Sequence, residues 1–142
     1  MEYQKVENNF IIKLSNGDDI FKAIYKVVNN EKIKSAWING LGACENVIIG
    51  SFPISKKKYL KKKLKGDYEI ISLVGNLSYK DNFPFLHLHV TLSDHDCNVF
   101  GGHLFSATVT ATCEIILFGM KKKIDRKLDK FTGLHLLDLD CG

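Results

Sequence analysis

The sequence predicts an α+β fold, a compact and largely antiparallel or mixed β-sheet with one main amphipathic helix. Two observations carry this prediction. Many segments are short, apolar and separated by turn residues, as strands are. Only one stretch, residues 19–30, repeats apolar residues at helical spacing. Many strands with a single helix are typical of α+β proteins whose sheet is mainly antiparallel.

The length of 142 residues allows one hydrophobic core and is too short for two ordinary domains. With 45% hydrophobic and 25% charged residues, the composition is that of a globular protein. We therefore expect a single domain over residues 1–142, with a core over about residues 3–120 and a basic C-terminal tail.

The sequence shows no feature of a membrane or secreted protein. It has no run of about 18 apolar residues, and its N-terminus lacks a basic start followed by an apolar stretch. The four cysteines, Cys44, Cys97, Cys113 and Cys141, form no C-x-x-C pair, which favours reduced thiols. We therefore expect a cytoplasmic protein with no membrane partner.

The formal net charge of +4 comes almost wholly from lysine, because Arg126 is the only arginine. Bidentate recognition of guanine or phosphate depends on the planar guanidinium of arginine. The composition therefore argues against such recognition as the main mode of binding.

The first half of the chain predicts three strands and the helix. Phe10–Leu14 is short and mostly apolar, as an opening strand is, and a turn leads from it into the helix at Asp19. Ser35–Asn39 and Val47–Phe52 are the next strands, joined by a sharp turn at Gly40–Ala43. A phosphate-binding loop is the alternative for this Gly-x-Gly, but no third glycine or G-K-[ST] follows, so the turn is favoured.

Residues 56–65, K-K-K-Y-L-K-K-K-L-K, contain seven lysines in ten positions. Such a run can bind a polyanion, either nucleic acid or an acidic membrane surface, with salt-sensitive affinity. The alternative is a solvated edge strand or hairpin, in which lysines deter unwanted strand pairing. We favour the edge strand, because a charge run by itself specifies no partner. The candidate nucleic-acid-binding residues are Lys56, Lys57, Lys58, Lys61, Lys62, Lys63 and Lys65.

The second half predicts further strands. Tyr68–Leu77 is strongly strand-like, and its polar residues Glu69 and Asn76 either line a site or face solvent. A polar loop is expected over Tyr79–Pro84, and Thr108–Leu117 is β-branched and apolar enough for another strand. The roles of Glu69 and Asn76 stay open.

On that last strand, Cys113 is expected to be a buried and inert thiol. The apolar run around it could supply a surface for self-association. The C-terminal segments, Lys121–Lys130 and Leu134–Leu139, carry no clear pattern and are assigned no element.

The stretch Phe85–Leu104 contains four of the five histidines. Side chains alternate along a strand, so His87 and His89 lie on one face while the apolar residues between and beside them point to the core. If a hairpin turns near Asp96, His103 faces His89 from the neighbouring strand. The sequence thus predicts three imidazoles on one face of two paired strands.

Three converging imidazoles are a typical set of zinc ligands, and catalytic zinc sites often combine three protein ligands with an open position. We therefore predict that His87, His89 and His103 bind zinc or another divalent metal. Half-exposed histidines that only form hydrogen bonds are the alternative. His95 at the turn and His135 in the tail are assigned no role.

A Ser-His-Asp or Cys-His arrangement that uses Ser93, Asp94 or Cys97 ranks lower, because nothing in the sequence defines the mutual geometry of these residues. The catalytic residues, if any, are unknown at this level.

Four segments resemble the motifs of one family, in the order in which that family carries them. They are S-A-W-I-N-G-L-G-A (Ser35–Ala43), E-I-I-S-L-V-G-N (Glu69–Asn76), F-L-H-L-H-V-T-L-S-D (Phe85–Asp94) and G-G-H-L (Gly101–Leu104). With the opening strand and helix they span nearly the whole chain. The sequence therefore resembles the plant and prokaryote conserved (PPC or PCC) domain, long known as a domain of unknown function.

This resemblance implies a compact α+β domain that assembles as a homotrimer, in a family whose prokaryotic members stand alone. Some of those members carry a metal, with zinc implied, on histidines that match His87, His89 and His103 here. The fold also resembles that of acetolactate decarboxylase, whose zinc is held by an H-x-H and a later histidine. That enzyme's arginine has no counterpart in the matched motifs, because Arg126 lies outside them, and this does not favour decarboxylation.

Plant members of the family join this domain to AT-hook segments, and the family is often labelled DNA-binding for that reason. An AT-hook resembles an R-G-R-P core that enters the minor groove, and this sequence has no such segment. The DNA-binding label could thus belong to the extra segment of the plant proteins.

Three hypotheses follow from the sequence. The leading one is a homotrimeric PPC-domain protein with a three-histidine metal site that binds a small molecule or supports metal-dependent chemistry. The alternative is a nucleic-acid-associated module that acts through the lysine run at residues 56–65. The third is a mainly structural interaction protein. The sequence does not identify a substrate or show that a reaction occurs.

Overall fold

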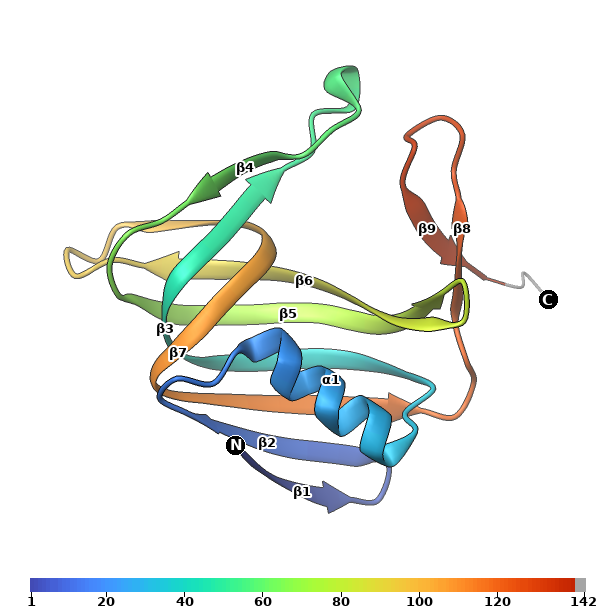
Figure 1. Cartoon of the computed structure of the whole chain (residues 1–142), viewed down its shortest axis with the longest axis horizontal. Coiled ribbons are helices and arrows are strands. Elements are labelled where there is room, and N and C mark those ends of the chain that lie inside the picture. The colour runs from blue at the N-terminus through green and yellow to red at the C-terminus, as the bar shows by residue number, and fades with distance from the viewer. Residues whose placement is uncertain (140–142) are drawn as a thin grey trace.

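The computed structural model describes residues 1–139 and contains nine strands, one α-helix and one short 3-10 helix (Figure 1). Cys141 lies outside the described residues. In chain order the elements are β1 (Glu2–Val6), β2 (Asn9–Ser15), α1 (Ile20–Glu31), β3 (Ser35–Ser51), η1 (Ile54–Lys56), β4 (Leu60–Lys63), β5 (Tyr68–Lys80), β6 (Phe83–Ser93), β7 (Val99–Met120), β8 (Asp125–Leu128) and β9 (His135–Asp138).

The strands form one mixed sheet in which β7 is the longest member. Its order is β1-β2-β7-β3-β5-β8-β9, while β4 pairs with β3, and β6 pairs with both β5 and β7. The strands β3, β5, β6 and β7 therefore make a closed circuit of pairings. All described strand pairs are antiparallel except β5 with β8. The predicted α+β class is confirmed.

Helix α1 lies across one face of this sheet and covers the core (Figure 1). It starts after Asp19, whose side chain accepts a hydrogen bond from the backbone N–H of Lys22 at 2.9 Å, as an N-cap does. It ends at Lys32, which adopts the left-handed conformation. The residues that it buries are Ile20, Ala23, Ile24, Val27 and Val28, at the predicted spacing. No described helix is long and apolar enough to cross a membrane.

The predicted sharp turn at Gly40–Ala43 is wrong, because β3 runs without interruption from Ser35 to Ser51. Its pairing with β5 shifts register between Gly40 and Gly42, which marks a bulge. Gly42 has φ of +147°, and a Cβ there would collide with the carbonyl oxygen of Thr112 on β7. The glycines therefore serve a bulge and a close strand contact rather than a chain reversal.

The predicted polar loop over Tyr79–Pro84 is also shorter than expected. Strands β5 and β6 are joined by Asp81 and Asn82 alone, with φ of 50° and 66°. Two consecutive positive φ angles are typical of a type I′ hairpin turn, which aspartate and asparagine tolerate well. Strand β6 therefore begins at Phe83, before the proline.

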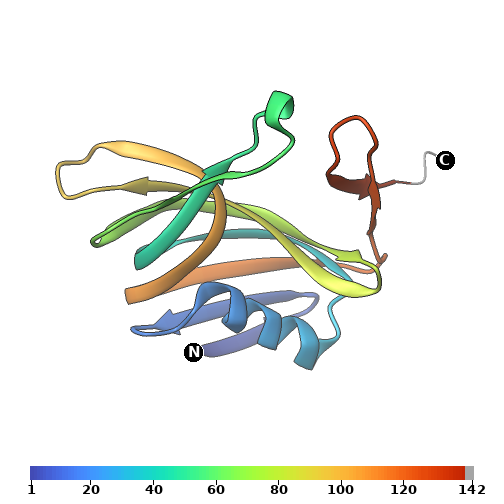
Figure 2. The same ribbon diagram turned by 45° about the horizontal axis from the view of Figure 1, so that its top comes forward.

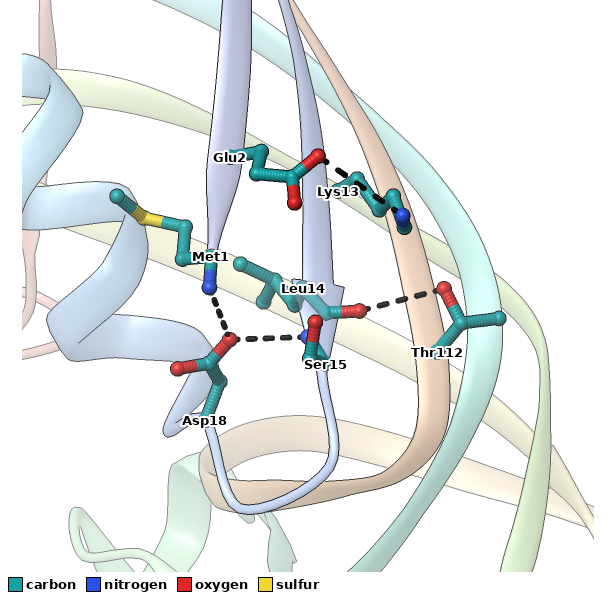
Figure 3. Close-up of polar contacts among 7 residues, drawn as sticks. All are labelled: Met1, Glu2, Lys13, Leu14, Ser15, Asp18 and Thr112. Atoms are coloured by element: carbon teal, nitrogen blue, oxygen red, sulfur yellow. Dashed lines mark hydrogen bonds and ion pairs between the residues drawn. The ribbon is translucent and has the colours of Figure 1, made fainter.

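Contacts at the N-terminal edge hold β1 and β2 to the rest of the sheet (Figure 3). The Asp18 carboxylate lies 3.0 Å from the Met1 amino group and accepts the Ser15 N–H at 2.9 Å. The Thr112 hydroxyl of β7 donates to the Leu14 carbonyl at 3.2 Å. The hydrogen bond from Ser15, followed by that from the amino group, lowers the pKa of Asp18. Strand β1 had no sequence signal.

Three of the seven candidate lysines, Lys61, Lys62 and Lys63, lie on the edge strand β4, and the others lie in the segments just before and after it. We term this group of seven lysines the lysine-rich edge. Strand β4 pairs with β3 alone among the described strands, and all seven candidate lysines are exposed. This agrees with the solvated-edge interpretation, in which charge protects an open strand.

The C-terminal segment, which was assigned no element, forms a β8–β9 hairpin. It is attached to the sheet through the pair Tyr79 and Asp125, and the Tyr79 N–H donates to the Ile124 carbonyl at 2.8 Å. In both ribbon views this hairpin and the loop between β3 and β4 rise from the same side of the sheet (Figures 1 and 2).

Candidate metal centre

Strand β6 places its histidines as the alternation predicts. His87 and His89 point away from the core, while Leu86, Leu88, Val90 and Leu92 on the same strand are buried. Strand β7 returns beside β6, and its register sets His89 opposite His103. The hairpin prediction is confirmed.

The three imidazoles form one cluster. The Nε2 atoms of His87 and His89 lie 3.2 Å apart. Ring centroids are 5.1 Å apart for His87 and His103, and 5.3 Å for His89 and His103. One ring nitrogen from each residue lies within 4.8 Å of the other two. Neutral imidazoles in this arrangement can share a proton or bind one cation.

The ring of His103 packs against two aromatic side chains. The rings of Tyr59 and Phe105 approach its ring at centroid distances of 4.8 and 4.7 Å. Its Nδ1 atom is buried and has no hydrogen-bond partner among the described residues. An unsatisfied buried ring nitrogen needs an explanation, because such groups are costly and rare.

The surroundings of His87 and His103 favour their neutral forms near pH 7. Burial lowers the pKa of His103 to about 4, and the nearby His87, His89 and Lys61 act in the same direction. Burial also lowers the pKa of His87, followed by the charge of Arg126 and by His89. Neutral rings keep a lone pair for a metal.

Arg126 on β8 is the site residue that sequence reasoning missed. Its Nε donates to the Ser78 hydroxyl at 2.6 Å, and its two terminal nitrogens donate to the Asn76 side-chain oxygen at 2.9 Å and the His135 carbonyl at 2.8 Å. One of these nitrogens also lies 3.5 Å from Nδ1 of His87. The guanidinium thus ties the β8–β9 hairpin to β5 beside the cluster.

One sequence signal could have drawn attention to Arg126, namely that it is the only arginine in a chain rich in lysine. Only the arginine fork can reach several fixed acceptors at once. The contacts also answer the open question about two polar residues: Asn76 belongs to the site through Arg126, whereas Glu69 is exposed and does not line the cavity.

A cavity of about 380 Å³ opens beside the cluster. It lies between the β8–β9 hairpin and the two histidine strands, with Tyr59 and one residue of α1 at its border. The lining comprises Phe21, Tyr59, Phe85, Leu86, His87, His103, Leu104, Phe105, Arg126, Gly133, Leu134, His135 and Leu136. This size and mostly apolar lining are typical of a small-molecule site.

The other candidate residues take different positions. His95 is exposed at the turn between β6 and β7. The Asp94 carboxylate in that turn accepts hydrogen bonds from the backbone of Asp96 and from Asn98, so it organises the turn. Ser93 donates to a backbone carbonyl. These contacts give no support to a catalytic triad at the turn.

Of the seven candidate lysines, Lys61 comes near the cluster. Its ammonium group lies 3.9 Å from the centroid of the Phe105 ring, at a cation–π distance. None of the seven lines the cavity. The cavity and the lysine-rich edge are therefore adjacent but separate features.

Solved structures that share this architecture include three of similar sequence. A proposed DNA-binding protein from Bacteroides thetaiotaomicron is 31% identical, with 96% of each chain covered and a TM-score of 0.92. A plant- and prokaryote-conserved protein from Pyrococcus horikoshii is 36% identical, over 97% of this chain and 94% of that one, with a TM-score of 0.85. A metal-containing protein from Archaeoglobus fulgidus is 37% identical, over 98% and 99%, with a TM-score of 0.85.

A more distant likeness concerns the fold alone. Acetolactate decarboxylase from Bacillus subtilis is 18% identical, with 92% of this chain and 60% of that chain covered and a TM-score of 0.57. No curated protein sequence matches the chain.

The model of the Plants and Prokaryotes Conserved (PCC) domain family matches residues 1–121. This range includes α1, the three histidines and the strands that carry them, whereas the β8–β9 hairpin lies beyond it. Since the match covers most of the chain, and solved structures of similar sequence have the same fold, the chain belongs to the PCC domain family.

Proposed function

We propose that this protein binds a divalent metal ion, zinc foremost, on His87, His89 and His103, and that the adjoining cavity takes a small molecule next to that ion. The observation that carries the proposal is the convergence of three ring nitrogens within 4.8 Å. Imidazole nitrogens are suitable ligands for zinc and for other late transition metals.

The spacing of the nitrogens supports one shared ion. Two nitrogens bound to a tetrahedral zinc ion at about 2.05 Å lie roughly 3.3 Å apart. The Nε2 atoms of His87 and His89 are 3.2 Å apart. A cation would also give a partner to the buried, unsatisfied Nδ1 of His103 if it bound there. The metal-containing protein from Archaeoglobus fulgidus, at 37% identity, adds support.

Three protein ligands leave a coordination position open. A zinc ion held there would act as a Lewis acid toward an oxygen atom of the bound molecule. The protein itself contributes the apolar walls, which exclude water, and the Arg126 guanidinium, which is fixed by three hydrogen bonds. These features serve either ligand binding or metal-dependent chemistry.

The proposal includes a homotrimer, and one surface of the sheet supports self-association. Opposite α1, the sheet carries a set of exposed apolar side chains, which we term the outer apolar face. It consists of Ile11, Trp37, Leu41, Ile71, Ile116, Phe118 and Met120. Contiguous apolar patches of this kind mark protein interfaces more often than free surface.

Metal analysis tests the proposal. The protein is purified without a histidine tag, dialysed with zinc and analysed by mass spectrometry of its metal content. We expect about one zinc ion per chain, its loss in His89→Ala, and its retention in His95→Ala, since His95 is exposed at the turn. Equal zinc content in the wild type and His89→Ala would contradict the proposal.

A second candidate function is nucleic-acid binding through the lysine-rich edge. All seven lysines are exposed, and the similar protein from Bacteroides thetaiotaomicron is a proposed DNA-binding protein. Each phosphate contact adds roughly 0.9 to the slope of log affinity against log salt. Replacing Lys61, Lys62 and Lys63 with glutamine should therefore make the dependence of the affinity for random-sequence DNA on salt less steep.

The matched control replaces Lys22, Lys26 and Lys34, which are exposed outside the edge, and should leave the slope unchanged. Fluorescence anisotropy with a labelled duplex at low salt gives the measurement. An absence of binding by the wild type at low salt would remove this candidate.

A further inference from the structure

Among the described residues, no carboxylate forms an ion pair with Arg126. Its three close hydrogen-bond acceptors are neutral, namely the Ser78 hydroxyl, the Asn76 side-chain oxygen and the His135 carbonyl. The guanidinium is only partly exposed and it lines the cavity. A half-buried cation without a carboxylate partner is uncommon, because neutral acceptors and the Phe85 ring, 4.8 Å from the guanidinium carbon, offset only part of its desolvation.

The guanidinium keeps donors for a ligand. Arginine has five N–H donors, and three of those on Arg126 are used by the close contacts. One N–H remains on each terminal nitrogen. The nearest other acceptor is Nδ1 of His87, at 3.5 Å. If His87 binds metal through Nε2, its Nδ1 carries the proton and can no longer accept.

The other charged groups near the cavity are also positive. None of the residues that line it is an aspartate or glutamate. Lys61 stands nearby over the Phe105 ring at 3.9 Å. A metal ion at the histidines would add further positive charge. A low-dielectric cavity with only positive groups attracts an anion and discriminates against cations.

The walls are mainly apolar. They include Phe21, Phe85, Leu104, Leu134 and Leu136, and the volume is about 380 Å³. A ligand that fills the cavity must therefore present carbon to most of the surface and charge at one end. Each apolar side chain it covers contributes by removal of surface from water.

We infer that the ligand is a small carboxylic acid with an apolar body, whose carboxylate binds the two remaining N–H donors of Arg126. A carboxylate has one charge and two oxygens that match the arginine fork. A phosphate monoester carries close to two charges and three acceptor oxygens, which is more than these donors satisfy. This inference rests on the proposed function for the small-molecule cavity, whereas the contact between the carboxylate and Arg126 does not require the metal ion.

Phenylacetate tests the inference, with phenylacetamide as its neutral isostere and inorganic phosphate as the competing anion. Binding to the full chain is measured by titration with ¹H–¹⁵N NMR spectra, once with zinc and once with EDTA. We expect phenylacetate to bind at least tenfold more tightly than phenylacetamide in both conditions, and phosphate to bind more weakly than phenylacetate. Equal affinities for the acid and the amide would overturn the inference, as would tighter binding of phosphate.

Two variants separate the role of Arg126 from effects on folding. Asn76→Asp keeps the arginine and gives it an internal counter-ion at the 2.9 Å contact, so the preference for the acid should disappear. Arg126→Gln should remove it as well, and thermal unfolding checks that this variant is folded. Persistence of the tenfold preference in folded Asn76→Asp would contradict the inference.

His89→Ala distinguishes this inference from the metal proposal. That variant should lose zinc and retain the preference for phenylacetate, because Arg126 is not bonded to His89. A wild type that binds zinc and shows no preference refutes the carboxylate assignment alone. A wild type that shows the preference and binds no zinc refutes the metal proposal alone.

Discussion

His103 can stand opposite His89 because the two residues before it are glycines. A Cβ at Gly101 would collide with the carbonyl oxygen of Val90, so β6 and β7 could not approach as they do. At the residue scale, the cluster thus depends on a small residue that carries no chemistry of its own. The G-G-H sequence therefore joins a packing requirement to a candidate ligand.

The histidines could be predicted because their relation is local. Alternation along β6 needs only the spacing of His87 and His89, and the position of His103 needs only the centre of one hairpin. Arg126 could not be predicted in this way. It reaches Asn76 and Ser78 across about fifty residues of chain, and no periodicity encodes such a contact.

The pKa of His103 gives a prediction for the metal-free protein. Its folded value, about 4, lies below the ordinary value of 6.5, so the unfolded chain binds more protons between these pH values. The contribution of His103 to stability is complete above pH 6.5 and is lost as the pH falls toward 4. The shift corresponds to about 3 kcal/mol at most.

Urea unfolding with EDTA, measured from pH 7 to pH 4, checks this prediction. The loss of unfolding free energy on acidification should be smaller in His103→Asn than in the wild type, because the titrating group is gone. His95→Asn, at the exposed turn, should behave as the wild type does. If the unfolding free energy of His103→Asn falls as steeply with decreasing pH as that of the wild type, His103 does not titrate as described.

At the element scale, the sequence predicts where the strands lie more accurately than it predicts the residues at which they begin and end. Apolar segments predicted from Ser35, Tyr68, Phe85 and Thr108 all lie within strands. Strands β3 and β7 continue well past the predicted ends, because residues that often mark turns, glycine above all, also permit bulges in a continuous strand. A single sequence does not distinguish a glycine that turns the chain from one that lets another strand approach.

Arg126 holds the β8–β9 hairpin in position, and the buried Ser78 hydroxyl is one of the groups that it binds. The Ser78 side chain is fully buried and accepts from Arg126 Nε at 2.6 Å. Ser78→Ala leaves the N–H without this acceptor, so we expect a loss of roughly 1–3 kcal/mol in unfolding free energy.

Hydrogen exchange shows whether that loss is local. Amides of β8 and β9 should exchange faster in Ser78→Ala, while those of β2 and β3 should exchange nearly as in the wild type. Ser106→Ala on β7, outside the Arg126 contacts, serves as the control. Unchanged exchange in the hairpin would mean that Arg126 does not hold it in place.

At the scale of the whole molecule, the two faces of the sheet differ in what covers them. One face is covered by α1, and the opposite side of the sheet presents the exposed residues of the outer apolar face. Trp37 and Phe118 lie directly across from each other there and are 50% and 44% exposed. The fold class followed from the pattern of segments, whereas the closed circuit of β3, β5, β6 and β7 depends on long-range pairing that no local pattern specifies.

The proposed homotrimer predicts that a charge in the outer apolar face separates the subunits. Trp37→Asp should convert the trimer into a monomer, because an unpaired carboxylate cannot be buried in an apolar interface without a large cost. Light scattering with size-exclusion chromatography gives the mass. Phe131→Asp is the control, since Phe131 is 73% exposed in the turn of the β8–β9 hairpin. A monomeric wild type would contradict the trimer.

The main proposal for this protein is that one metal ion binds to three histidines from β6 and β7. A crystal structure with anomalous diffraction data on both sides of the zinc absorption edge tests it most directly. We expect one peak per chain, about 2.0–2.1 Å from a ring nitrogen of each of His87, His89 and His103. A zinc peak at other residues, or none at the cluster in crystals grown with zinc, would contradict it.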